Sequence, residues 1–278
     1  MEVGIIGLGL IGGSLGLDLG DRGFTVLGVS RRESTCQRAI EKGIVDRANI
    51  NLSLLSNADI VIICTPIGLI VPTLKELIPH LSKKTIVTDV GSVKTPIVEK
   101  CSKLWDKFIG GHPMAGTAEQ GVEAAQRDLF KDAPYVITPR ANTPKDSVKL
   151  LEEIAIRLGA KVYQCTPEDH DRAVALISHL PVMVSANLIK TCLGEEDPLI
   201  LKLAQNLASS GFRDTSRVGG GNPELGVMMS QYNQKALLRS LLEYRQQLDQ
   251  IIEQIEQENW QDLKQILEIT KSGRVPFL

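Results

Sequence analysis

Residues 3–12 read VGIIGLGLIG, a short β-branched run followed by three glycines in the spacing Gly-x-Gly-x-x-Gly. The run predicts a buried strand, and the residues after it predict a helix. In such a strand–turn–helix unit, Gly7 permits the tight turn, Gly9 lets a pyrophosphate approach the backbone, and Gly12 lets the helix pack closely on the strand. Free N–H groups at the start of the helix also attract phosphate. The stretch therefore predicts a dinucleotide-binding turn made of Gly7, Leu8, Gly9, Leu10, Ile11 and Gly12.

The second predicted strand, residues 25–29, is followed by Ser30, Arg31 and Arg32. An acidic residue at position 30 would hold both ribose hydroxyls of NAD and repel a 2′-phosphate. Ser30 does not repel this phosphate, and the two arginines add charge-assisted donors. We therefore predict NADP rather than NAD, the alternative being that both arginines are solvated surface charges.

The composition is that of an ordinary globular protein, with 278 residues, a net charge of −2 and a pI of about 6.1. No overall field attracts nucleic acid or a membrane. Apolar runs such as residues 60–64 are too short to span a bilayer, and Met1 leads directly into a strand, so we expect no membrane segment and no signal peptide. The dispersed cysteines indicate reduced thiols in a cytoplasmic protein, without a metal site. They are Cys36, Cys64, Cys101, Cys165 and Cys192.

Up to about residue 165, short β-branched runs alternate with helical patterns. This alternation predicts an α/β domain with a doubly wound, mostly parallel sheet covered on both faces. The expected strands are 3–6, 25–29, 59–64, 85–88, 134–137 and 161–164. The expected helices are 11–22, 34–42, 68–81, 93–104, 118–128 and 144–158. We take residues 1–165 as the dinucleotide-binding domain.

Residues 166–278 read as an all-helical second domain. Thr166 is a good N-cap for a helix to about residue 190, with a kink expected at Pro181 if the helix continues. Further helices are expected over 198–210 and 223–270, the second with room for an interruption. An apolar stripe on the last stretch faces either its own core or a second subunit. The stripe consists of Leu241, Tyr244, Leu248, Ile251 and Ile255.

Three more strand ends carry candidate site residues. Thr65 and Pro66 follow the strand at 59–64, where loops line the crevice that holds a dinucleotide. His112 lies among small residues in GGHPMAGT, which we interpret as a loop. An imidazole there suits a general base that takes a proton from an alcohol while hydride leaves the same carbon. Ser92, in DVGSVK, is placed to orient this imidazole or to bond the reacting hydroxyl.

The remaining histidines and two arginines have less specific settings. His80 is expected in solvent, and His170 in an acidic helical turn is expected to pair locally with charge. His179 is either a core histidine or part of a cleft. Arg213 and Arg217 are spaced to bind carboxylates bidentately, or else serve a helix end or a subunit contact.

Five segments follow one another along the chain in this order: GLGLIGGSLG, DVGSVK, GGHPMAGT, ISHLP and GFRDTSRVG. Together they resemble one family, the prephenate/arogenate dehydrogenases of tyrosine biosynthesis. The resemblance implies a Rossmann-type domain, an all-helical dimerisation domain and an active site in the cleft between them. It also implies oxidative decarboxylation of a cyclohexadienol, with hydride passing to the nicotinamide and CO2 leaving as the ring becomes aromatic.

The resemblance also implies roles for individual residues. His112 would be the base or hydrogen-bond partner of the C4 hydroxyl, and Ser92 would support it beside the cofactor. Arg217 would bind a substrate carboxylate, and Arg213 would contribute from the paired subunit. Thr117 and His179 would lie at the substrate.

Two departures from the family pattern bear on the substrate. Val182 stands where many prephenate enzymes have a second histidine, and Ala118 stands where many have glutamate. Together with Ser-Arg-Arg, they favour the conversion of L-arogenate to L-tyrosine with NADP. The alternatives are a prephenate dehydrogenase that gives 4-hydroxyphenylpyruvate, a hydroxyacid dehydrogenase of similar layout, and a non-catalytic NADP(H)-sensing protein.

Overall fold

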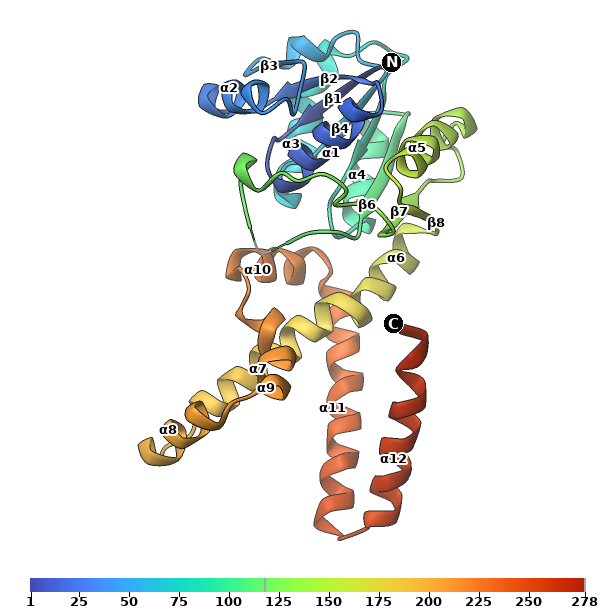
Figure 1. Cartoon of the computed structure of the whole chain (residues 1–278). Helices are drawn as coiled ribbons and strands as arrows, with labels where there is room; N and C mark the ends of the chain where they lie inside the picture. Colours follow the sequence, from blue (N-terminus) through green and yellow to red (C-terminus); the bar gives the residue numbers. More distant parts are fainter. Residues whose placement is uncertain (118, 278) are drawn as a thin grey trace.

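The computed structural model describes residues 1–117 and 119–277. Within them the chain begins with an eight-stranded sheet and ends in a set of helices that project from it (Figure 1). The strand order is β3-β2-β1-β4-β5-β6-β7-β8. The strands are β1 Glu2–Ile6, β2 Thr25–Val29, β3 Arg47–Asn49, β4 Ile60–Ile63, β5 Ile86–Asp89, β6 Phe108–Pro113, β7 Pro134–Thr138 and β8 Lys161–Gln164.

The sheet is parallel except where β6 meets β7. Buried side chains alternate between its two faces, so Ile5 packs with one core cluster and Ile6 with the other. Helices α1, α2 and α5 cover the first face, and α3 and α4 cover the second. Their bounds are α1 Leu10–Asp21, α2 Glu33–Glu41, α3 Ile67–Leu77, α4 Thr95–Leu104 and α5 Lys145–Arg157. The Rossmann-type doubly wound sheet is thus confirmed.

Strand order reverses between β1 and β4, the type of place where doubly wound sheets bind nucleotides. In the register, Ile6 lies opposite Ile63, and Ile63 lies opposite Asp89. The strands β1, β4 and β5 therefore end in one row. Because β6 runs parallel to β5, its carboxyl end reaches the same edge.

Two predictions for this domain are wrong. Residues 108–113 form a buried central strand, so His112 belongs to β6 and not to a loop. Between residues 119 and 128, only Val122–Ala124 is helical, as one 3₁₀ turn, where a helix over 118–128 was expected. The preceding Gly121 has φ 85°, which breaks the helix. The carboxylate of Glu123 accepts a hydrogen bond from Nε of Arg38 at 2.6 Å.

The all-helical second domain is also confirmed, with more breaks than predicted. The long segment expected over 223–270 is interrupted at Asn233 and at residues 257–259. The helix expected from Thr166 to about residue 190 is one continuous helical run, with a π-helical turn at Ala175–His179 shortly before Pro181. The elements are α6 Pro167–Val174, the π-helical turn Ala175–His179, α7 Leu180–Leu193, α8 Pro198–Leu207, α9 Ser210–Ser216, the 3₁₀ turn Arg217–Gly220, α10 Pro223–Tyr232, α11 Gln234–Glu256 and α12 Trp260–Gly273.

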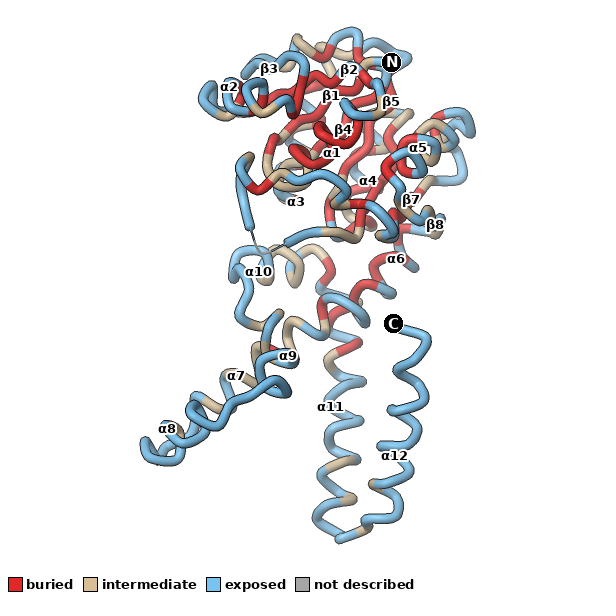
Figure 2. The backbone as a smooth tube through the Cα atoms, in the orientation of Figure 1, coloured by how far each residue is buried: buried red, intermediate tan, exposed pale blue. Residues whose placement is uncertain are grey.

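Figure 2 shows that burial is concentrated in the sheet, whereas α8, α11 and α12 are exposed along most of their length. One helical run, Pro167–Leu193, is long and apolar enough to cross a membrane by length and composition alone. The expectation that no segment reaches that length is therefore wrong for this run. Its first turns are polar and packed in the protein, since His170 and Asp171 are buried.

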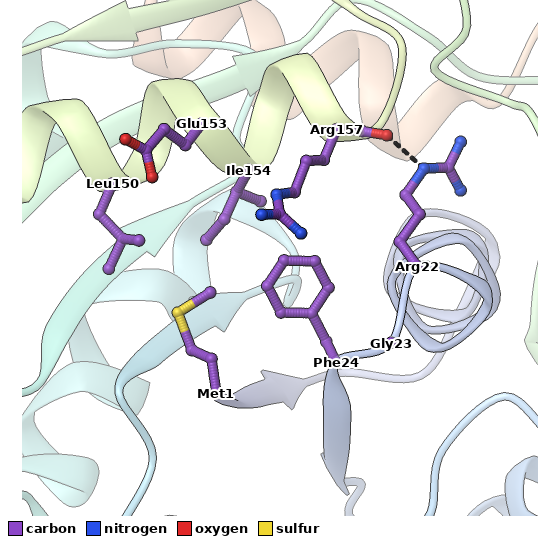
Figure 3. Close-up of a pocket in the computed structure, with 8 residues that line it drawn as sticks. All are labelled: Met1, Arg22, Gly23, Phe24, Leu150, Glu153, Ile154 and Arg157. Atoms are coloured by element: carbon purple, nitrogen blue, oxygen red, sulfur yellow. Dashed lines mark hydrogen bonds between the residues drawn. The ribbon is translucent and has the colours of Figure 1, made fainter.

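A cavity of about 250 Å³ lies at the opposite edge of the sheet from the carboxyl ends (Figure 3). Met1 and Phe24, just before β1 and β2, line it together with residues of α5. The guanidinium of Arg157 lies 5.3 Å from the centre of the Phe24 ring, and Arg22 donates to the backbone carbonyl of Arg157. Its position at the amino ends of the strands separates this cavity from the predicted nucleotide crevice.

Candidate active site

The glycine turn has the geometry that phosphate binding requires. Gly7 has φ 97°, a conformation that favours glycine, and a Cβ on Gly12 would lie 2.0 Å from the Gly7 carbonyl oxygen. A Cβ on Gly9 would meet no described atom within 4 Å, so the turn is open on that side. Among the described residues no side chain caps α1, which leaves its first N–H groups available to an anion.

Residues predicted to hold the rest of the cofactor surround this turn. The Gly7 amide donates to the carbonyl of Val29 at 2.8 Å, which brings Ser30 next to the turn. Arg31 and Arg32 are exposed, and Arg32 is the N-cap residue of α2. The hydroxyl oxygen of Thr65 is buried and has no hydrogen-bond partner among the described residues. An orphaned hydroxyl beside the turn fits a site that a bound dinucleotide completes.

A buried ion pair joins the ends of β5 and β6. The ammonium of Lys94 donates to the carboxylate of Asp89 and, at 2.7 Å, to the carbonyl of Gly111. Both side chains are fully buried. Burial lowers the pKa of Lys94, and the charge of Asp89 opposes this shift. The pair fixes the backbone immediately before His112.

His112 is buried near the carboxyl end of β6 and is bonded to a second histidine. Its Nδ1 lies 2.8 Å from Nε2 of His170, and Nδ1 of His170 lies 2.8 Å from a carboxylate oxygen of Asp171. His170 has a carboxylate partner next to it in sequence, as expected, but it is also buried and bonded to a residue of the sheet domain, which sequence reasoning missed. Ser92 is exposed, and no hydrogen bond joins it to His112 in the described part of the chain.

The network continues into the helical domain. The Asn233 amide, between α10 and α11, donates to the backbone carbonyl of Asp171 at 2.8 Å. It also lies 3.1 Å from Nδ1 of His179. Because this amide nitrogen carries only donors, His179 accepts at Nδ1 and carries its proton at Nε2. His179 is buried and hydrogen-bonded in this network, as expected of a core histidine, and its place at the substrate stays a prediction.

Burial keeps His112 and His179 neutral. It lowers the pKa of His112 well below 6.5, and the nearby Lys94 charge acts in the same direction. Burial likewise lowers the pKa of His179, to about 4. A neutral imidazole is the form that accepts a proton, so His112 is ready to act as a base at pH 7.

These pKa values predict a loss of stability in mild acid. Since the unfolded chain protonates His179 near pH 6.5 and the folded chain only near 4, the unfolded state binds more protons in between. Stability should fall as the pH falls from 6.5, by about 2 kcal/mol at pH 5 from His179 alone. Urea unfolding at a fixed protein concentration measures this. A His179→Gln variant should lose that part of the pH dependence, and an unchanged slope would contradict the assignment.

The two arginines lie on the segment after α7. Arg213 belongs to α9 and Arg217 begins the 3₁₀ turn, and both side chains are exposed. Arg213 pairs with the adjacent Asp214 at 3.2 Å. The Ser185 hydroxyl of α7 accepts from the Gly219 amide at 2.8 Å and donates to a carbonyl at 2.8 Å. These bonds fix the turn that carries Arg217, while no hydrogen bond joins either arginine to His112 within the described chain.

Two expectations concern the segment after β6. Thr117 is exposed, and its hydroxyl oxygen accepts from the Glu119 amide at 3.2 Å. Its predicted place at the substrate stays a prediction. Ala118, at the position where many family members have glutamate, lies outside the described residues.

Comparison with known proteins decides the family. A profile of the prephenate dehydrogenase nucleotide-binding domain matches residues 15–164, and a profile of the prephenate dehydrogenase dimerization domain matches residues 166–269. The chain belongs to the prephenate dehydrogenase family. It is therefore an oxidoreductase of the arogenate/prephenate dehydrogenase type, with a place in tyrosine biosynthesis, a small-molecule substrate and a nicotinamide cofactor.

Individual members of the prephenate dehydrogenase family are similar over the whole chain. A Synechocystis arogenate dehydrogenase is 59% identical, with a TM-score of 0.92 and complete coverage of both chains. The prephenate dehydrogenase of A. aeolicus, solved with hydroxyphenyl propionate and NAD⁺, is 27% identical with a TM-score of 0.92, over 100% of this chain and 98% of that one. Prephenate dehydrogenase from Bacillus subtilis is 31% identical over 277 residues, which cover 97% of this chain and 74% of the relative.

Proposed function

We propose that this chain is an NADP-dependent arogenate dehydrogenase, which converts L-arogenate to L-tyrosine and CO2. The observation that carries the substrate is the 59% identity with a Synechocystis arogenate dehydrogenase over the full length of both chains. The residues after β2 support the cofactor, since Ser30, Arg31 and Arg32 offer donors and no negative charge.

His112 supplies the base in this proposal. It takes the proton of the C4 hydroxyl on Nε2 as hydride leaves C4, because Nδ1 is occupied by His170. The ring carboxylate then departs as CO2, and its electron pair makes the ring aromatic. The proton on His112 returns to the oxygen, which becomes the phenol. Ser92 is proposed to bond the reacting hydroxyl from the loop after β5.

The cofactor-holding residues are assigned by their place around the glycine turn. We propose that the turn at residues 7–12 and Thr65 with Pro66 hold the pyrophosphate side, and that Ser30, Arg31 and Arg32 hold the 2′-phosphate. When bound, the nicotinamide accepts the hydride. Residues 1–165 are the proposed cofactor domain, and residues 166–278 the proposed substrate and dimerisation domain.

A rate matrix of two substrates and two cofactors tests the proposal. L-Arogenate and prephenate are each offered with NADP⁺ and NAD⁺, and reduced nicotinamide is followed by absorbance. We expect the highest kcat/KM for arogenate with NADP⁺. A higher kcat/KM on prephenate would replace the proposed substrate, and a preference for NAD⁺ would replace the proposed cofactor.

The second candidate is a prephenate dehydrogenase that gives 4-hydroxyphenylpyruvate. It is favoured by the B. subtilis relative, which carries that name. Val182, half-buried in α7, argues against it because a histidine is usual there in many prephenate enzymes. A non-catalytic NADP(H)-sensing protein would bind the cofactor without turnover in all four assays.

Arg217 is proposed to bind a substrate carboxylate. Replacing it with alanine should raise KM by about 10–100-fold with little change in kcat, because a charge-assisted hydrogen bond is worth roughly 1.5–3 kcal/mol. Steady-state kinetics with arogenate measures this. Arg217→Lys keeps the charge but not the bidentate geometry, so its KM should lie between the KM of the wild type and that of Arg217→Ala. A KM unchanged in Arg217→Ala would remove this role.

We further propose a homodimer through the helical domain, with Arg213 contributing to the partner's site. Apolar side chains on α8 and α11, including Leu203, Leu242 and Ile255, are exposed in the single chain. A second copy would cover them, which also explains why only 22% of the apolar window in Pro167–Leu193 is buried. We also propose a cytoplasmic protein, because its dispersed cysteines are typical of reduced thiols.

Sedimentation velocity tests the dimer. The chain of 30.4 kDa should sediment as a dimer, and Leu242→Asp on α11 should shift it to monomer. Ile156→Asp, on an exposed position of α5 in the sheet domain, is the matched control and should leave the dimer intact. A monomeric wild-type chain would overturn the proposal.

A further inference from the structure

Three buried side chains form one hydrogen-bonded chain from β6 to the start of α4. His112 bonds His170 at 2.8 Å, and His170 bonds Asp171 at 2.8 Å. Asp171 in turn accepts from the backbone amides of Lys94 at 2.7 Å and Thr95 at 2.8 Å. The carboxylate at the end of the chain is therefore held from its far side by backbone.

The direction of the hydrogen bonds follows from the chemistry of the groups. An ionised carboxylate only accepts, so His170 donates to Asp171 from Nδ1. A neutral His170 then has its lone pair at Nε2, where it accepts from Nδ1–H of His112. A neutral His112 with its proton on Nδ1 has a lone pair at Nε2.

We propose that His170 and Asp171 are positioning residues that hold His112 in the Nδ1–H tautomer, so that Nε2 is the nitrogen that receives the substrate proton. The inference rests on the proposed role of His112 as base. The inference also gives His170 a role during the reaction. When His112 becomes an imidazolium, its Nδ1–H still donates to His170, and His170 in turn donates to the carboxylate of Asp171.

The other charged groups around these three side chains are compatible with hydrogen bonds that run from His112 to His170 to Asp171. On β5 and the following loop, Asp89 balances the ammonium of Lys94. On the π-helical turn, His179 accepts from Asn233 at Nδ1 and has a lowered pKa, so it is neutral. Asp171 is thus the carboxylate that contacts His170. Burial tends to raise the pKa of Asp171, but hydrogen bonds from His170 and Thr95 outweigh it, and the pKa is lowered.

The opposite arrangement has a different signature. If His170 were protonated, its Nε2–H would donate to Nδ1 of His112. The proton of His112 would then sit on Nε2, and this nitrogen could not act as a base. The two arrangements differ in which ring nitrogen of His112 carries hydrogen, which can be measured without substrate.

The first experiment is two-bond ¹H–¹⁵N NMR of the full chain labelled at histidine. The chain has four histidines, and the spectrum of His112→Asn assigns the signals of His112 by their loss. At pH 7.5 we expect Nδ1 of His112 in the protonated range and Nε2 in the unprotonated range. The reverse pattern would overturn the inference, even if His112 proves essential for turnover.

The second experiment compares two substitutions of His170. A glutamine amide extends to the place of Nε2, so His170→Gln can still accept from His112. An asparagine amide extends only to the place of Nδ1, so His170→Asn leaves the Nδ1–H of His112 without its acceptor. We expect kcat for His170→Asn to fall about tenfold below that of His170→Gln, with KM within about threefold. Thermal unfolding of both variants verifies that each is folded.

The pH profile separates positioning from mere support of the fold. Losing an acceptor destabilises the imidazolium, so the acid limb of kcat/KM should move to lower pH in His170→Asn than in His170→Gln. A protonated His170 would give the opposite direction, since its removal would raise the pKa of His112. If His170→Asn and His170→Gln lose the same kcat and the acid limb of kcat/KM does not move, His170 is a structural residue and the inference is overturned. Full activity in His112→Asn would instead refute the proposed base.

Discussion

Replacing His112 with asparagine is expected to lower kcat by roughly 10²–10⁴-fold, the range over which general bases usually contribute. The asparagine amide reaches the place of Nδ1 and can keep the bond to His170, so the network survives. It has no group at the place of Nε2 and cannot accept a proton. KM for arogenate should change little, because the proposed carboxylate anchor is Arg217. The measurement is steady-state kinetics with arogenate and NADP⁺.

The control for this prediction is the same substitution elsewhere in the chain. His80 ends the 3₁₀ turn Ile78–His80, outside the hydrogen-bonded network, and His80→Asn should keep the wild-type kcat. Titration of NADP⁺ binding by fluorescence should be the same for wild type and His112→Asn. If His112→Asn turns over arogenate at the wild-type rate, the proposed mechanism loses its base.

The parts of the fold that sequence could predict depend on local signals. The glycine turn and the strand at 3–6 are recognisable because the turn, the helix start and the apolar run lie within ten residues. Strand β6 has no such signal, since FIGGHP contains two glycines and a proline. The reason for its composition is tertiary: a Cβ on Gly111 would lie 2.7 Å from the carbonyl oxygen of Asp89.

The candidate site likewise contains residues that local sequence indicates and residues that only the fold brings together. His112 stands out by residue type and neighbours, but its partner His170 is 58 residues away. The acidic setting of His170 correctly indicates a carboxylate neighbour, but it gives no sign that His170 contacts His112 of β6. The contact between the two histidines depends on Asp171, which accepts from the backbone amides at the start of α4 and so holds α6 against the sheet domain. In the sequence Lys94 likewise stands out only as the last residue of DVGSVK, whereas the fold buries it against Asp89.

Replacing Ser30 with aspartate is expected to shift the ratio of kcat/KM for NADP⁺ over NAD⁺ by at least roughly 10²-fold towards NAD⁺. The amide of Gly7 bonds the carbonyl of Val29, so position 30 follows directly at the end of β2, beside the turn. A carboxylate there would repel a 2′-phosphate and accept hydrogen bonds from the ribose hydroxyls of NAD⁺. Two effects of roughly 1.5 kcal/mol each give that factor.

Ser30→Asn is the matched control for charge, because asparagine has the shape of aspartate and no charge. It should change the NADP⁺/NAD⁺ ratio by much less than Ser30→Asp, and the difference between the variants isolates repulsion of the 2′-phosphate. Raising the salt concentration should narrow this difference, because position 30 lies beside the exposed Arg31 and Arg32 and the repulsion between its carboxylate and the 2′-phosphate is screened there. If both variants keep the wild-type ratio, the 2′-phosphate does not lie at position 30. The two arginines are then solvated surface charges.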